Sequence, residues 1–265
     1  MMRTSIAALV AAFPLIAAAG VPCEPQSMTA RDALHPVAMA EQTLEALDAL
    51  PDQVVLIARA GQNLDKYGLT YSHMAFAVRS SEQGWRVLHE LNGCGSSTSG
   101  IYEEGLVNFF TDNPYRYQAG IWRLTPTLQS KLHGLLVSDK FKQFHEPSYN
   151  MLAYPFSTKY QNSNGWILET LAASSVGADI LPTRAGVQTY LSTHGYQPTQ
   201  LELGPTTRLG ARTRANIAFD DHPGELRWSG RIRTVTVDSI VAWLGASKMC
   251  LQDGCPEKRV DLVKP

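Results

Sequence analysis

The chain of 265 residues is 44% hydrophobic and 18% charged, with a formal net charge of −1 and an isoelectric point of about 6.7. This composition is typical of a globular protein with a sizeable core. Because the net charge is near zero and the basic residues are scattered, we expect no nucleic-acid partner. No Gly-rich loop stands between a strand and a helix, so nucleotide binding has no support from motifs.

The N-terminus has the features of a secretory signal peptide. Arg3 precedes the apolar run "SIAALVAAFPLIAAAG", which ends in the small residues that a signal peptidase reads. Pro14 interrupts this run, which is shorter than the ~20 residues that a spanning helix needs. We therefore expect a signal peptide at residues 1–19 and one exported domain at 20–265, without a transmembrane span after signal removal. The periplasm is the expected compartment, and an extracellular location stays open.

Four cysteines in an exported chain permit disulfides. Three pairings are possible, and the sequence does not choose among them. Cys250 and Cys255 could close a small loop, but a bond from Cys23 to either of them, joining the two ends of the domain, is slightly preferred. Cys94 is expected to be a disulfide partner or an inert thiol. Because paired C-x-x-C and H-x-x-x-H motifs are absent, we expect no metal, and no motif implies a cofactor.

The first half of the chain predicts one helix followed by a small sheet. Helical spacing of Ala, Leu and Met predicts a helix over 38–50, ended by Pro51. The run "QVVLIARAG" predicts a buried strand. Residues 71–80 and 85–93 alternate as two antiparallel strands joined by "SEQG". A short helix is expected at 105–113.

The second half predicts more helices. "RYQAGIWRLTP" is a third strand candidate, and an amphipathic helix follows over 126–145. Helices are then expected in "GWILETLAASSV" and over 183–196. The rest is rich in loops up to "GRIRTVTVDSIVAWLGAS", which predicts a strand and then a helix. The predicted fold class is α+β, with a small antiparallel sheet packed on helices.

Two short motifs could carry chemistry. "GCGSSTSG" has serines and glycines but no following apolar helix, so it does not support the nucleophile elbow of an α/β-hydrolase. "DDHP", from Asp220 to Pro223, could be an acid–base or metal site or a turn that Asp caps and Pro stops. The turn is the favoured interpretation.

His73 and Ser163 are the pair that could form a catalytic site. His73 lies within a predicted strand, and a rigid strand would hold an imidazole as a general base. Ser163 lies at a predicted helix N-terminus, where free N–H groups and the helix dipole would stabilise an oxyanion. On spacing alone the structural alternatives are favoured: His73 as a hydrogen-bonded core histidine and Ser163 as a helix cap.

The chain resembles a known family in several segments. "GQNLDKYGLTYSHMAFAVR", "WRVLHELN", "GIYEEGLVNFF" and "AYPFSTKYQNSNGWILETLAA", followed by "HGYQPT" and "DDHP", resemble the exported bacterial proteins of the DUF2145 family. The family's pattern is in turn similar to circularly permuted NlpC/P60 proteins with a papain-like fold. In that arrangement a strand bearing the catalytic histidine precedes a helix that opens with the nucleophilic cysteine.

The resemblance implies roles for individual residues. His73 matches the histidine position, and Ser163 stands at the cysteine of the family's "QNCN" form. The group that orients the imidazole is expected from the following strand, as His89 or Asn92. On that strand His89 lies on the face opposite Glu90 and Asn92, and the sequence does not show which face is inward. The residues expected to form an oxyanion site or line a groove are Gln161, Asn162, Asn164, Tyr149 and Tyr154.

The serine leaves two functions open. A serine hydroxyl does not become an anion beside an imidazole as readily as a cysteine thiol does. The protein is expected to be either an amide or ester hydrolase or acyltransferase with a Ser–His pair, or a catalytically inactive cell-envelope protein. The inactive protein would use the same groove to bind a peptide, glycan or lipid.

Overall fold

The computed structural model describes residues 29–111, 114–211 and 213–262. The predicted signal peptide and Cys23 lie outside these residues. The protein is built around a six-stranded antiparallel sheet in the order β4-β3-β2-β1-β5-β8. The strands are β1 (Val54–Arg59), β2 (His73–Ser80), β3 (Gly84–Asn92), β4 (Ser99–Glu104), β5 (Gln118–Arg123) and β8 (Lys258–Asp261).

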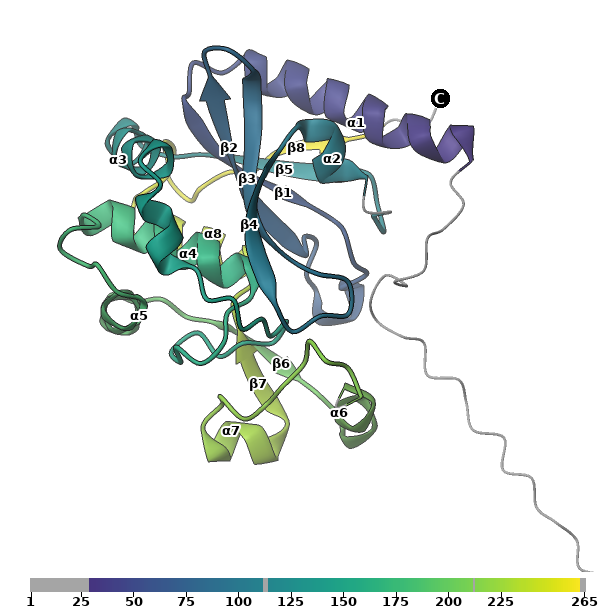
Figure 1. The fold of residues 1–265 in the computed structure, drawn as a ribbon, viewed down its shortest axis with the longest axis vertical. Coiled ribbons are helices and arrows are strands. Elements are labelled where there is room, and N and C mark those ends of the chain that lie inside the picture. The colour runs from purple at the N-terminus through teal and green to yellow at the C-terminus, as the bar shows by residue number, and fades with distance from the viewer. Residues whose placement is uncertain (1–28, 112–113, 212, 263–265) are drawn as a thin grey trace, which may run out of the picture.

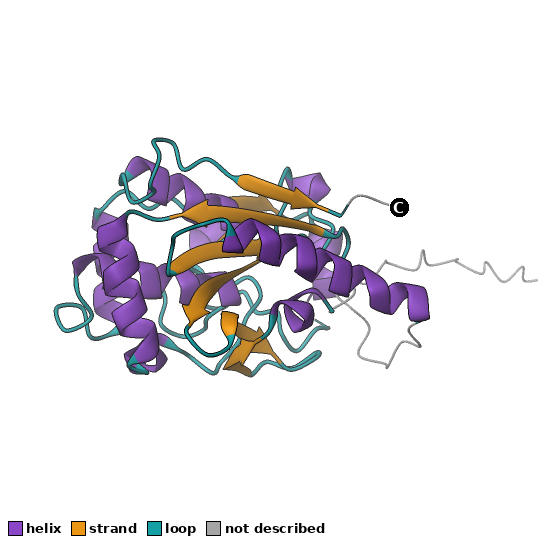
Figure 2. Cartoon of the chain, turned by 90° about the horizontal axis from the view of Figure 1, so that it is seen from above, coloured by secondary structure: helices purple, strands orange, loops and turns teal. Residues whose placement is uncertain are grey.

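Helices cover both faces of this sheet (Figures 1 and 2). On one face, α1 (Ala30–Asp48) and α2 (Leu106–Phe110) pack on alternate strand residues such as Ile57 and Ala75. On the other, α3 (Pro126–Val137), α4 (Ser163–Val176) and α8 (Val237–Ala246) pack on the residues between them, such as Leu56 and Phe76. α5 (Arg184–Thr193) packs against α4. The two faces are called the α2 face and the α4 face below.

A small lobe extends from the sheet at the lower end of Figure 1. Its two-stranded antiparallel sheet pairs β6 (Thr199–Glu202) with β7 (Arg231–Thr234), and α6 (Pro205–Ala211) and α7 (Gly224–Ser229) flank it. The lobe has its own apolar cluster, formed by Leu69, Leu201, Leu203, Ala211, Phe219 and Ile232. Two 3-10 helices, η1 (Asp65–Tyr67) and η2 (Lys140–Phe144), complete the described elements.

The predicted α+β class is confirmed, and the differences concern element ends and short strands. The first helix begins at Ala30, with Pro36 inside it, rather than at 38. The helix predicted over 126–145 ends at Val137, because Asp139 adopts a left-handed conformation (φ 58°) before η2. β4, β6 and β8 were not expected, because each has only one or two apolar residues and so little hydrophobic pattern.

Cys250 and Cys255 form a disulfide. The preferred bond from Cys23 to one of these two residues is therefore wrong. Residues 254 and 255 both have positive φ angles, and this tight turn brings the two Cα atoms to 5.1 Å. Cys94 is not a free thiol either. A disulfide is typical of proteins from oxidising compartments.

Within the described ranges, no helix is long and apolar enough to cross a membrane. The same ranges hold no group of three or more His, Cys, Asp or Glu side chains placed to bind a metal ion.

Candidate functional site

The N-terminus of α4 is capped by Asn162. Its Oδ1 accepts a hydrogen bond from the Gly165 N–H at 2.7 Å, and its Nδ2 donates to the Met151 carbonyl and the Thr234 hydroxyl. Ser163 is the first residue inside the helix. The structural alternative that made Ser163 the cap is therefore wrong, because the cap is Asn162. The cap also ties the start of α4 to β7, which carries Thr234.

Asn164 joins this helix end to the backbone beside His73. Its Oδ1 accepts from the Met74 N–H at 3.0 Å, and its Nδ2 donates to the Ser72 carbonyl at 3.2 Å. The ladder between β2 and β3 begins only at Phe76, so the two strands separate toward His73. The Asn164 amide fills this opening and takes the place of a strand partner for β2.

The His73 side chain lies on the α2 face. Its Nε2 is 2.9 Å from Nδ1 of His89, and both rings pack near Phe109 of α2. Nε2 of His89 is 3.3 Å from the carboxylate of Glu104. In a neutral His89, the Nε2–H donates to the Glu104 carboxylate, and Nδ1 therefore accepts from His73 Nε2. The three side chains form one hydrogen-bonded chain across β2, β3 and β4.

Burial lowers the pKa of His73 well below its usual value, and the nearby Arg59 guanidinium lowers it further. His73 is therefore neutral at pH 7. A neutral imidazole is able to accept a proton, as a general base must.

The Ser163 side chain lies on the α4 face. Its hydroxyl and the Glu90 carboxyl both lie close enough to the Tyr149 phenol to influence its ionisation. Burial, with the effect of Glu90, raises the pKa of Tyr149. Tyr149 therefore stays protonated and cannot serve as a base for Ser163 at neutral pH.

Glu90 is fully buried on the same face. Burial raises its pKa to about 8, an increase that the nearby Ser99 hydroxyl partly offsets. Neither carboxyl oxygen has a hydrogen bond of normal geometry within the described ranges, so the Ser99 hydroxyl stabilises the carboxylate only weakly. Glu90 is mainly protonated at pH 7.

Ser163 and His73 are thus placed on opposite faces of β2, and no hydrogen bond joins them within the described ranges. His89 is beside His73, where an orienting residue was expected. Asn92 lies at the end of β3, where its Nδ2 donates to the carbonyls of Gly93 and Ser96. The catalytic roles of these residues stay predictions.

The amides expected to form an oxyanion site are committed to structural bonds. Asn162 caps the helix and Asn164 pairs with β2. Gln161 donates to the Phe144 carbonyl and to the Glu169 carboxylate, both at 2.9 Å. In each of the three amides, both the oxygen and the nitrogen already form hydrogen bonds within the protein.

Tyr154 packs against the turn formed by the "DDHP" motif. The Tyr154 ring packs on His222, and its N–H donates to Asp221 at 2.8 Å. Nδ1 of His222 is 2.9 Å from Asp221, and Nε2 is 2.9 Å from the Arg233 carbonyl. The Asp221 and His222 side chains are fully buried and hold this turn against β7, whereas Asp220 and Pro223 are exposed.

Sequence reasoning missed a buried ion pair behind α4. Arg184, on α5, donates to both oxygens of Glu169, at 2.7 Å and 3.1 Å, and Gln188 adds a third bond to that carboxylate. The signal was present: Glu169 is the one charged residue in the apolar helix "WILETLAAS". A charge at such a position needs a buried partner.

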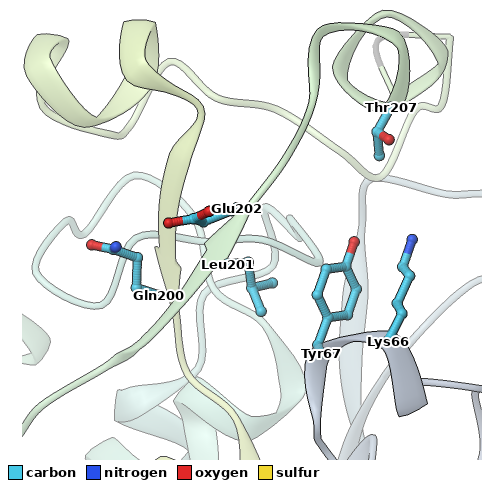
Figure 3. A pocket seen from close by; sticks show the side chains of 6 residues that line it. All are labelled: Lys66, Tyr67, Gln200, Leu201, Glu202 and Thr207. Carbon is cyan, nitrogen blue, oxygen red and sulfur yellow. The ribbon is translucent and has the colours of Figure 1, made fainter.

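Two cavities lie near these elements. The one at the start of α4 has a volume of only about 10 Å³, roughly the space of one water molecule. The larger cavity, of about 410 Å³, lies between η1 and the small lobe (Figure 3). Its lining residues are Lys66, Tyr67, Gln200, Leu201, Glu202 and Thr207.

The family model described as "uncharacterized protein conserved in bacteria (DUF2145)" matches residues 46–244. The chain therefore belongs to the DUF2145 family. The matched range includes β2, β3 and α4, and with them both groups of side chains described above. No curated protein and no solved structure matches the chain.

Proposed function

We propose that the protein is a ligand-binding protein of the bacterial cell envelope rather than a hydrolase. The observation that supports this most directly is the placement of the His73 ring and the Ser163 hydroxyl on opposite faces of β2. A general base must lie within hydrogen-bonding reach of the hydroxyl it activates. A serine without such a base is a weak nucleophile at neutral pH.

The surroundings of Ser163 support the same proposal. Tyr149 and Glu90 are both protonated at pH 7, so neither accepts the serine proton. The Ser163 side chain is itself buried and lines neither of the two cavities described above. Ser163 is then a structural residue at the position of a nucleophile.

The cellular location and ancestry belong to this proposal as well. An apolar N-terminal segment with a signal-peptide pattern and a Cys250–Cys255 disulfide both fit export to an oxidising compartment. A strand histidine followed by a helix that opens at the nucleophile position fits a permuted papain-like, NlpC/P60-like arrangement that has lost its catalytic pair. The ligand would then be a peptide, glycan or lipid of the envelope.

One observation favours hydrolysis or acyl transfer as a second candidate. The chain from His73 through His89 to Glu104 resembles the way catalytic imidazoles are oriented by a second residue. For catalysis, the His73 ring would have to reach the α4 face and meet Ser163.

A fluorophosphonate probe that labels activated serines separates the two candidates. For a binding protein we expect no labelling of the wild type above that of Ser163→Ala, measured by intact mass. Labelling that Ser163→Ala abolishes would contradict the binding proposal. Ser163→Cys, treated with iodoacetamide at pH 7, is the companion test. Because the helix N-terminus by itself favours a thiolate, its rate is compared with that of Ser163→Cys combined with His73→Gln, and equal rates are expected if His73 does not act on residue 163.

A further inference from the structure

β6 has a free edge along the cavity of about 410 Å³. It pairs only with β7 within the described ranges, and the opposite edge faces no strand. Side chains of consecutive strand residues point to opposite faces of a sheet. Because Gln200, Leu201 and Glu202 all line the cavity, it must run beside the strand, along its edge.

The register shows which backbone groups face this edge. The Leu203 N–H donates to the Gly230 carbonyl at 2.9 Å, and the β6–β7 register continues in step from this pair. Hydrogen-bonded and non-bonded pairs alternate in an antiparallel ladder. The Leu201–Ile232 pair is therefore bonded, whereas the N–H and C=O groups of Gln200 and Glu202 point away from β7.

Side chains around this edge offer an aromatic ring and two charged groups to a ligand. Tyr67 presents a half-buried ring, and the Lys66 ammonium lies 4.6 Å from the centre of that ring. Lys66 and Glu202 are exposed, line the cavity, and have no ion-pair partner within the described ranges. In Figure 3, Lys66 and Tyr67 extend side by side from η1 toward Thr207, with β6 alongside.

We propose that this cavity binds an extended peptide, which joins β6 as a third strand. The proposal rests on the binding function above and selects the peptide among its ligand classes. Among these classes, only a peptide has backbone N–H and C=O groups with the spacing of a β-strand, so only a peptide can pair with the backbone groups of both Gln200 and Glu202. A volume of about 410 Å³ is in the range of ~300–1,000 Å³ typical of ligand pockets. Lys66 and Glu202 favour a peptide with an acidic and a basic side chain near its centre.

The first experiment selects the peptide with the full-length mature protein. A phage library of linear random octapeptides is panned on it, and the enriched sequences are synthesised with a fluorescent label for anisotropy titration. We expect enriched peptides that carry both an acidic and a basic residue. Recovery of no binding sequence would overturn the proposal.

Edge variants then locate the bound peptide. Gln200→Pro removes an N–H that points away from β7, so the β6–β7 ladder is retained. Relative to the matched Gln200→Ala, which keeps the N–H, we expect binding about fivefold to tenfold weaker for the loss of one hydrogen bond. Equal affinity of the two variants would contradict strand addition.

Amide exchange provides a readout that does not depend on a folded proline variant. The Gln200 and Glu202 amides should exchange rapidly in the free protein and become protected when the selected peptide is added. Binding without protection of these amides would place the peptide elsewhere. Protection that grows with protein concentration alone would show edge pairing between two copies, which also contradicts the proposal.

The two proposals fail in different ways. Fluorophosphonate labelling of Ser163 would refute the binding function and leave the peptide site at β6 intact as a possible substrate site. Absence of peptide binding, together with absence of labelling, would refute only the peptide site.

Discussion

The two faces of strands β2 and β3 treat their buried ionisable groups differently. On the α2 face, His73, His89 and Glu104 are joined in one hydrogen-bonded chain. On the α4 face, Glu90 is buried without a hydrogen bond of normal geometry within the described ranges. Hydrogen bonds between neighbouring side chains thus stabilise the buried polar groups of the α2 face. On the α4 face, Glu90 is accommodated because it is protonated and carries no charge. The contrast shows that a polar residue at a strand position does not by itself indicate a catalytic site.

A second contrast lies within the α4 face itself. Glu169 is held by Arg184, Gln188 and Gln161, whereas Glu90 has no comparable partner. Replacing Glu169 should therefore lower the stability of the fold, whereas replacing Glu90 should change how stability depends on pH.

The largest effect is expected from Glu169→Ala. It leaves the Arg184 guanidinium buried without its partner, which should lower the free energy of unfolding by about 3–5 kcal/mol. Chemical denaturation followed by tryptophan fluorescence measures this change. The control is Glu103→Ala, which removes a partly exposed partner of Arg86 and should cost less than about 1 kcal/mol. Equal losses for the two variants would contradict the larger contribution expected from the buried ion pair.

Glu90 should make the protein less stable as the pH rises from about 4.5 to about 8. Its pKa is about 8 in the folded protein and near 4.5 when unfolded, so the folded state binds the extra proton between these values. The stabilisation is complete below pH ~4.5 and is lost progressively as the pH rises to about 8, by on the order of 5 kcal/mol. Glu90→Gln cannot ionise, so its stability should change less between pH 5 and pH 9 in urea titrations. An unchanged slope in this variant would show that Glu90 is not the group that titrates.

Asn164 connects the two faces, because it holds the start of α4 against the backbone on either side of His73. Asn164→Ala leaves the Met74 N–H and the Ser72 carbonyl without these bonds and should cost about 1–3 kcal/mol. Asn164→Asp keeps the acceptor for Met74 and should lose less. Thermal unfolding by calorimetry compares the three proteins, and an equal loss for Asp and Ala would contradict the pairing role.

The smallest effect is expected on the α2 face. Because burial lowers the pKa of His73, its contribution to stability is present above pH ~6.5 and is lost as the pH falls through the lowered value. His73→Gln should remove this acid-sensitive contribution and cost about 1 kcal/mol at pH 8 for the bond to His89. Stability curves from pH 4 to pH 8 test this prediction. Persistence of the full acid loss in His73→Gln would assign it to another group.

Local sequence patterns were sufficient for the α+β class and for most of the longer elements. Strand alternation placed His89 on one face of β3 and Glu90 on the other, and both positions agree with the structure. The question of which face is inward had no single answer, because helices cover both faces. The cap-rich stretch "QNSNG" correctly marked the start of α4, although the cap itself is Asn162.

The partner of each buried polar group was decided only by the tertiary structure. Ser163 and His73 are separated by 90 positions in the chain, and whether they share a face depends on how α4 enters the opening between β2 and β3. The ion pair of Glu169 with Arg184 and the free edge of β6 depend in the same way on packing between distant segments. Hydrophobic periodicity reports which side of an element is buried. It does not identify the residues that the buried side contacts, because each contact also depends on a second segment that can lie far away in the sequence.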